Sequence, residues 1–236
     1  MKVLRNLFTL LLVTGGLLVQ AQTADEIVAK HIAAIGGADS WKKVNSMYQE
    51  GSMTVQGTDV AIAMTVLHKK GMRQNISLMG MTGYQIMTPT AGWNFMPFQG
   101  QQKPEAITAD ELKENVDELD TQGELIDYKT KGHTVEYLGK DDVEGTEAYK
   151  LRITQKSGKV KTFYIDPATN YIIRTVAKQK ANGQEVEVTT DLSDYKKLPE
   201  SIVMPMSVKL PFGQMKVTKV EVNKPVDENL FKPDTK

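Results

Sequence analysis

Most of this chain alternates apolar and polar residues with a period of two, the pattern of strands that bury one face. In residues 60–66 every second residue is apolar, and in 149–153 Tyr149, Leu151 and Ile153 share a face opposite Lys150 and Arg152. Similar runs cover 47–55, 72–80, 83–88, 92–97, 133–139, 159–166, 170–178, 184–191, 201–209 and 214–223. The pattern therefore predicts a mainly β fold with about a dozen strands.

Residues suited to reversals separate these runs. Asn182-Gly183 fits a type I′ hairpin turn, and Glu144-Gly145, Ser157-Gly158 and Asp166-Pro167 are typical of other reversals. The apolar phase slips between Val217 and Val220, which predicts a β-bulge. No strand alternates with a helix as parallel βαβ units require, so we expect sequential antiparallel strands.

Two capping boxes predict helices. Thr23 and Glu26 start a helix that buries Ile27, Val28, His31, Ile32 and Ile35 and ends at Gly36-Gly37. Asp39 is expected to cap a short turn through Trp41 and Val44.

Thr108 and Glu111 start the second helix, over 108–119, inside the polar stretch 99–128, which is interpreted as a crossing loop. Its single apolar stripe of Leu112, Val116 and Leu119 indicates a helix that lies on a surface as a lid. The expected fold is a strongly curved antiparallel sheet, or incomplete β-barrel, covered by the N-terminal helix and this lid helix.

Residues 1–21 have the features of a cleavable signal peptide. Lys2 and Arg5 precede an uncharged run of 13 residues, Leu7 to Val19, and Val19-Gln20-Ala21 fits a cleavage site. The alternative, a retained membrane anchor, is disfavoured because a spanning helix needs about 20 apolar residues. We therefore expect residues 22–236 to form a single domain, exported to the periplasm of a Gram-negative-type bacterium.

Charge and cysteine content narrow the class of protein further. Without Lys2 and Arg5, 27 basic residues face 29 acidic ones, so there is no electrostatic case for nucleic acid or an anionic membrane surface. The chain has no cysteine, which excludes disulfides and the lipid acceptor of a lipoprotein. The mature protein is expected to be soluble and not itself membrane-spanning.

The sequence offers no catalytic or metal-binding constellation. His31, His68 and His133 lie far apart, and no Gly-x-Ser-x-Gly, phosphate-binding glycine loop or His-Glu-x-x-His is present. The acidic residues between Asp110 and Asp120 are better explained as the solvated face of the lid helix than as catalytic carboxylates. We expect no enzyme activity, no metal and no cofactor, and a hydrolase is the least favoured alternative.

Methionine and aromatic residues gather in two parts of the sequence. Methionine lines surfaces that accept ligands of variable shape, although these residues on their own better fit an ordinary β core. A helix that covers a concave apolar face with only three anchoring residues is easily displaced. This arrangement favours a pocket for an apolar ligand, with the helix as its lid. The expected lining residues are Met64, Leu78, Met79, Met81, Ile86, Met87, Trp93, Phe95, Met204 and Met206.

Four segments resemble the LolA/LolB superfamily of bacterial outer membrane lipoprotein-sorting proteins. These are Gly145–Leu151 followed by Thr162–Arg174, which is similar to the family's strand–strand–turn–strand unit, then Gly92–Pro97, and finally Pro225–Phe231. The resemblance covers most of 23–233 and carries structural motifs, so it bears on the fold more than on activity.

The resemblance implies an incomplete barrel with a cavity for acyl chains. A basic residue of the carriers has two candidate matches, Lys70 and Arg73. The favoured hypothesis is a non-enzymatic periplasmic carrier for lipid or lipoprotein acyl chains, with a possible membrane-bound donor and acceptor as partners. The alternative is an envelope sensor or protein-interaction module with a closed core and no lipid cargo.

Overall fold

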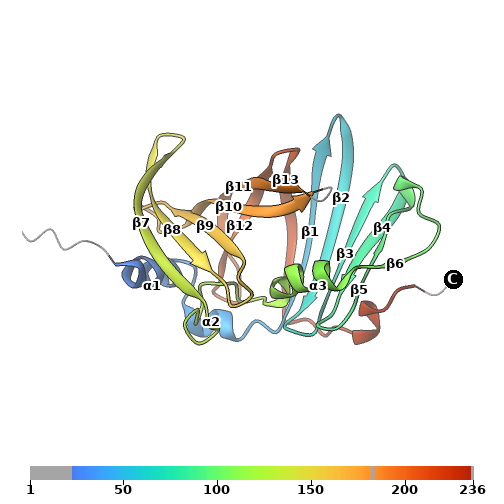
Figure 1. Ribbon diagram of the computed structural model, residues 1–236, viewed down its shortest axis with the longest axis horizontal. Coiled ribbons are helices and arrows are strands. Elements are labelled where there is room, and N and C mark those ends of the chain that lie inside the picture. Colours follow the sequence, from blue (N-terminus) through green and yellow to red (C-terminus); the bar gives the residue numbers. More distant parts are fainter. Residues whose placement is uncertain (1–22, 182–183, 235–236) are drawn as a thin grey trace, which may run out of the picture.

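The computed structural model describes residues 23–181 and 184–234, and shows one large antiparallel sheet with three short α-helices (Figure 1). The predicted signal peptide and the predicted Asn182-Gly183 turn lie outside the described residues. The first strands are β1 (Ser46–Val55), β2 (Thr58–Leu67), β3 (Gly71–Leu78), β4 (Met81–Met87), β5 (Gly92–Phe95) and β6 (Glu105–Ala106). The remaining strands are β7 (Thr134–Val143), β8 (Thr146–Thr154), β9 (Val160–Ile165), β10 (Ile172–Ala181), β11 (Gln184–Lys197), β12 (Val203–Leu210) and β13 (Gly213–Val222).

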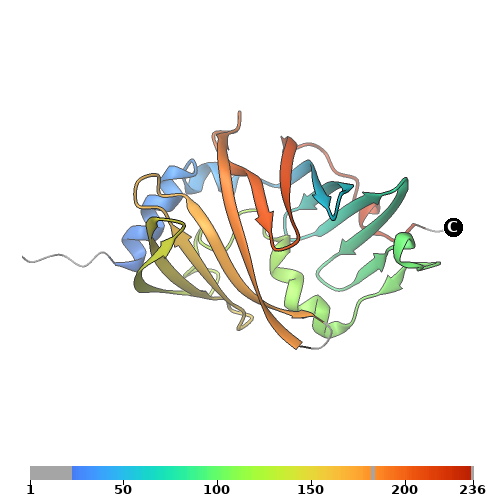
Figure 2. The ribbon, with the colours of Figure 1, turned by 90° about the horizontal axis from the view of Figure 1, so that it is seen from above.

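The strand order is β6-β5-β4-β3-β2-β1-β13-β12-β11-β10-β9-β8-β7, and every pair is antiparallel. The sheet is not closed, because β6 and β7 form its two edges. It coils so that the β7 end passes in front of α1 while the β2–β4 end lies behind α3 (Figures 1 and 2). The face that carries the helices is called the inner face here. This arrangement confirms the predicted curved, incomplete barrel.

The stretch 99–128 is the crossing loop that the sequence predicts. It leaves the β5–β6 edge and reaches β7 at the opposite edge, and its apolar side chains pack on the inner face along the way. On the way it forms α3 (Ala109–Asn115) and a 3₁₀ turn, η2 (Val116–Leu119). Figure 2 shows α3 between the two halves of the sheet.

Helix α1 (Ala24–Ala34) seals the inner face of the β7–β10 region. The predicted capping box is present, since Thr23 accepts from the amide of Glu26 and the Glu26 side chain accepts from the amide of Thr23. Ile27 and Val28 pack into a cluster of Leu125, Tyr128, Leu151, Ile153, Phe163 and Ile165. His31 is a packing histidine as expected, buried with its Nδ1 2.8 Å from the Asn170 carbonyl oxygen.

Helix α2 (Ala38–Lys42) corrects one prediction. Asp39 lies in the first turn and does not cap the helix; the N-cap is Gly37, whose φ of 84° suits glycine. Trp41 donates from Nε1 to the Ile35 carbonyl at 2.9 Å and packs with Val44 over the centre of the sheet. Ile32 and Ile35 are half-buried beside that cluster.

The predicted bulge lies in β13, where it pairs with β1. Glu50 faces Lys219 while the next residue, Gly51, faces Val217, so Thr218 is the extra residue. Because of this residue, Val222 and Val220 beyond the bulge and Val217 before it all face inward, as the slipped apolar phase requires.

The outer face of β3 and β4 is covered by the C-terminal segment. Its 3₁₀ turn η3 (Glu228–Phe231) inserts Phe231, which is 4% exposed, against Tyr84 and Ile86. Gly71 provides the room, since a Cβ there would lie 2.5 Å from the Phe231 ring. This second covered face was not predicted.

Candidate ligand-binding face

Residues 109–119, here called the covering segment, rest on the inner face of β2–β4. The capping box of Thr108 and Glu111 fixes the start of α3, as predicted. Leu119 is 2% exposed, while Leu112 and Val116 are half-buried. These three side chains pack on Val66, Met72, Met87 and Met64. The apolar contacts between the covering segment and this cluster therefore all come from the predicted narrow stripe.

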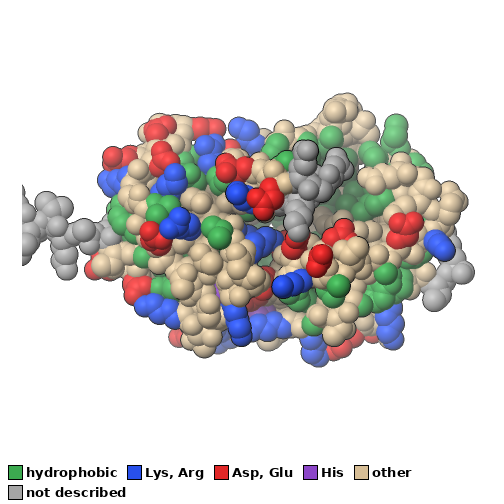
Figure 3. Space-filling view, in the orientation of Figure 1, with side chains coloured by type: hydrophobic (Ala, Val, Ile, Leu, Met, Phe, Trp, Pro, Cys, Tyr) green, Lys and Arg blue, Asp and Glu red, His purple; other side chains and the backbone are tan. Residues whose placement is uncertain are grey.

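Above the covering segment the inner face continues as an apolar surface. Strand register places Met53 and Val60 opposite one another on this face, and both are buried. Figure 3 shows green side chains in a hollow in the upper right of the molecule, where this face is open. The half-buried apolar side chains on these strands are Ile62, Met64, Ile76, Leu78, Met215 and Val217.

Strands β10 and β11 border this surface on its other side. The pairing of β10 with β9 ends at Ala177, and the pairing of β11 with β12 begins at Asp191. Between these two residues β10 and β11 continue to pair with one another. The resulting arm, residues 178–181 and 184–190, extends in front of β1 and β2 (Figures 1 and 2). Val186 on the arm is 38% exposed. The apolar surface thus lies on β1–β4 and is bordered by the arm and the covering segment.

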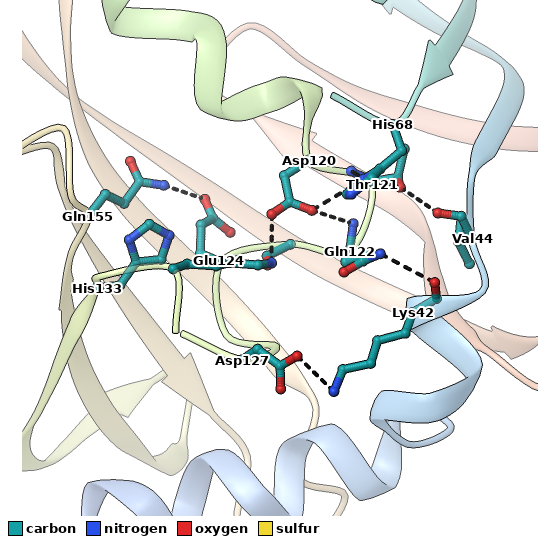
Figure 4. Close-up of polar contacts among 12 residues, drawn as sticks. Lys42, Val44, His68, Asp120, Thr121, Gln122, Glu124, Asp127, His133 and Gln155 are labelled. Atoms are coloured by element: carbon teal, nitrogen blue, oxygen red, sulfur yellow. Dashed lines mark hydrogen bonds and ion pairs between the residues drawn. The ribbon is translucent and has the colours of Figure 1, made fainter. Parts of the chain in front are cut away.

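A polar linker, residues 120–133, anchors the covering segment at its C-terminal end (Figure 4). Lys69 donates its amide to the Leu119 carbonyl at 2.8 Å, and Thr121 donates its hydroxyl to the Val44 carbonyl at 2.9 Å. Asp120 pairs with Lys131 at 2.6 Å, with both side chains less than one-fifth exposed. This end of the covering segment is therefore fixed by polar contacts as well as by Leu119.

Next to these contacts the linker meets β8 and β9 through Glu124. Glu124 pairs with Lys161 and accepts from Gln155 Nε2 at 3.3 Å. Burial alone raises the pKa of Glu124, but Lys161 and the nearby Lys159 outweigh it and hold that pKa below its ordinary value. The Oε1 atom of Gln155 is buried without a hydrogen-bond partner.

The β8–β9 turn holds the middle of the covering segment from the opposite half of the sheet. Lys159 donates from Nζ to the Glu114 carbonyl at 3.1 Å, and Ser157 donates from Oγ to Asp117 Oδ2 at 2.7 Å. The covering segment therefore bridges the molecule, with its apolar side on β2–β4 and polar contacts to β8–β9. The Ser157-Gly158 turn is recognisable from the sequence, but no sequence pattern signals the role of Lys159.

The predicted lining residues occupy several environments. Met64, Leu78 and Met87 share the inner face, whereas Ile86, Trp93 and Phe95 pack on the outer side near Phe231. The other four lie at a hairpin or beneath α2. Met79, which is 78% exposed, lies in the β3–β4 turn, and Met81, which is 43% exposed, begins β4; Met204 and Met206 pack with Trp41.

Both basic candidates contact the C-terminal segment. Arg73 forms a two-bonded ion pair with Asp234, with distances of 3.0 and 2.9 Å, and stacks on Tyr84 with Cζ 4.3 Å from the ring centroid. Lys70 pairs with Glu228 at 2.5 Å. The structure therefore gives these two residues partners away from the covering segment.

Two shallow cavities of about 470 and 320 Å³ lie on β1–β3, lined by small and polar side chains that include Ser52, Ala61 and Ser77. These side chains alternate with the inner-facing ones, so they belong to the outer face. Within residues 23–181 and 184–234, no cluster of three histidine or acidic residues could hold a metal. In the same ranges no helix is long and apolar enough to cross a membrane.

Comparison with solved structures identifies the fold. A DUF1329 family protein from Desulfovibrio piger superposes with a TM-score of 0.55 at 14% identity, covering 89% of this chain and 98% of that one. LolA superfamily protein NE2245 from Nitrosomonas europaea gives 0.56 at 9% identity, covering 90% and 99%. A putative outer membrane lipoprotein-sorting protein domain from Vibrio parahaemolyticus gives 0.53 at 12% identity, covering 87% and 94%.

The chain therefore has a LolA-like fold. No family model and no curated protein matches its sequence. At these identities the likeness establishes the fold alone, and the function has to be argued from the inner face.

Proposed function

We propose that this protein is a non-enzymatic carrier that binds lipid or lipoprotein acyl chains on the inner face of β1–β4 and β13. The observation that carries the proposal is the row of half-buried apolar side chains beside a covering segment whose apolar contacts come from only three of its residues. An acyl chain would extend over this row and take the place of Leu112, Val116 and Leu119. Residues 1–21 support a proposed periplasmic location.

The energies of covering and binding are of similar size. Burying a large apolar side chain fully is worth about 1.5–3 kcal/mol, so two half-buried residues and Leu119 contribute roughly 3–6 kcal/mol. An acyl chain gains about 0.8 kcal/mol per buried methylene, so about eight methylenes offset this cost. Exchange between the closed and loaded states therefore needs no chemical step, which suits a carrier.

Neighbouring positions on β2 provide a direct test. Ile62 faces inward and Ala61 faces outward, so Ile62→Glu places a charge on the proposed binding surface while Ala61→Glu is its matched control. We expect the wild-type protein and Ala61→Glu to bind a fluorescent fatty acid and to copurify with lipid on native mass spectrometry. Ile62→Glu should lose both. Equal binding by the two variants, or none by the wild type, would contradict the proposal.

The alternative function, a protein-interaction module, depends on a different feature. Strand β7 presents an edge of 10 residues that pairs only with β8 in the part of the chain that the structure describes. An added strand from a partner could pair there. This function predicts partner capture that Ile62→Glu does not alter, together with an absence of bound lipid.

A further inference from the structure

The covering segment combines two chemistries on one short stretch of chain. Its apolar stripe of Leu112, Val116 and Leu119 fills the inner face. Its remaining surface is strongly acidic, since residues 109–119 contain five acidic side chains and one lysine, for a net charge of −4. The segment that occupies the proposed binding face is therefore itself an anionic amphiphile.

The part of the sheet that this acidic surface meets is basic. The β8–β9 turn and the start of β9, residues 155–161, contain three lysines and no acidic residue. Lys161 is neutralised by Glu124, and Lys131 by Asp120. Lys159 instead donates to the Glu114 carbonyl at the end of α3, and Ser157 donates to the Asp117 carboxylate.

Displacement of the covering segment removes these partners. Lys159 and Ser157 would then lose the carbonyl and carboxylate oxygens that they bind, at the side of the apolar surface. An uncharged headgroup offers Lys159 no counter-charge, whereas a phosphate or carboxylate restores a charge-assisted hydrogen bond to the ammonium and the hydroxyl. In the closed state an apolar stripe covers the sheet while a carbonyl and a carboxylate oxygen accept from Lys159 and Ser157.

We infer that the ligand of this face is an amphiphile with an anionic headgroup, and that Lys159 and Ser157 of the β8–β9 turn bind that headgroup. The inference rests on the proposed function, because it requires the acyl chain to displace the covering segment. It adds the class of ligand: an acyl chain that carries a phosphate or a carboxylate. The covering segment reproduces both features within the protein itself.

Four amphiphiles with the same twelve-carbon chain test this inference: dodecyl phosphate, laurate, zwitterionic dodecylphosphocholine and uncharged dodecyl maltoside. Each is titrated by calorimetry below its micelle concentration. We expect the phosphate, the carboxylate or both to bind about tenfold more tightly than the other two, with a preference that falls as salt increases. Comparison of the phosphate with laurate then distinguishes a phospholipid-like headgroup from a fatty acid.

Lys159→Gln is expected to abolish this preference, bringing the four affinities within about twofold of one another. Lys140→Gln, which removes the same charge from a lysine of β7 that pairs with Glu147 of β8, is the matched control and should keep the preference. A purely structural effect of Lys159 would change all four affinities by the same factor and would overturn the inference. Equal binding of the four compounds by the wild type would also overturn it while leaving the carrier function intact, whereas no binding of any compound would contradict both.

Discussion

In the β7–β10 region, Ile27 and Val28 of α1 close a cluster in which Leu151, Ile153 and Ile165 are completely buried. In the β1–β6 half of the same sheet, the inner face is covered by a segment of which only Leu119 is buried, and apolar side chains stay half-exposed beyond it. The two regions have the same strand pattern. The difference teaches that a uniform sheet can divide its roles, with one region sealed by a buried cluster and the other covered by few apolar contacts, where the proposed ligand would bind.

The largest effect on stability is expected in the sealed region. Leu151→Ala removes a completely buried side chain and should lower the free energy of unfolding by about 2–5 kcal/mol, measured by urea denaturation. Arg152→Ala, the next residue on β8, is exposed and should change it by less than about 0.5 kcal/mol. Comparable losses for the two variants would contradict the claim that the buried cluster of the β7–β10 region is the main source of its stability.

Leu119→Ala should have the next largest effect, because Leu119 is the one buried residue of the covering segment. The expected loss of unfolding free energy is about 2 kcal/mol, at the lower end for a leucine because this cluster lies beside the open apolar surface. Glu118→Ala, an exposed neighbour, is the control for the same denaturation experiment. A neutral Leu119→Ala would show that the polar linker alone fixes this end.

Acid should destabilise the sealed region through His31. Burial lowers the pKa of His31, and the weaker opposing effect of its contact with the Asn170 carbonyl does not restore it. Because the folded pKa lies below the unfolded value of about 6.5, the unfolded chain takes up the proton first, and stability is lost as the pH falls below about 6.5. Urea midpoints between pH 7 and 5 should fall less steeply in His31→Gln than in the wild type. Lys30→Gln, on the same helix, should keep the wild-type slope.

The smallest effect on stability is expected from Leu112→Ala, which should cost less than about 1 kcal/mol because the side chain is half-buried. The same variant should bind dodecyl phosphate more tightly and exchange the amides of 109–115 faster, since the covering segment is then easier to displace. Leu151→Ala should leave the affinity unchanged. An unaltered affinity in Leu112→Ala would contradict the role of the covering segment.

Local sequence signals predicted most of the fold. Both capping boxes, the bulge near Val217 and the crossing of residues 99–128 depend on nearby residues, so each could be identified before the structure. Asp39 was wrongly expected to cap α2 because cap preference is weak beside the backbone geometry that Gly37 provides. The C-terminal cover of the outer face depends on contacts between Phe231 and Gly71, which lie far apart in the chain.

The candidate site was predicted only in part, for a related physical reason. Alternation shows which residues share a face of one strand, but pairing across the whole sheet decides which of the two faces becomes the inner one. Met87 and Ile86 are neighbours in β4, yet one lies beneath the covering segment and the other beneath Phe231. The contact of Lys159 with Glu114 joins two segments that are 45 residues apart, and no local pattern signals it.

The route of the covering segment from one sheet edge to the other has a kinetic consequence for a carrier. Both of its ends continue into the sheet, through β6 and through the linker to β7, so a displaced segment stays tethered beside the face that it left. For short tethers the effective local concentration is on the order of millimolar. Reclosure is then a unimolecular step that does not depend on how dilute the protein is. Under the proposed function, the protein carries its own competitor for the cargo and can release the cargo without an external displacing factor.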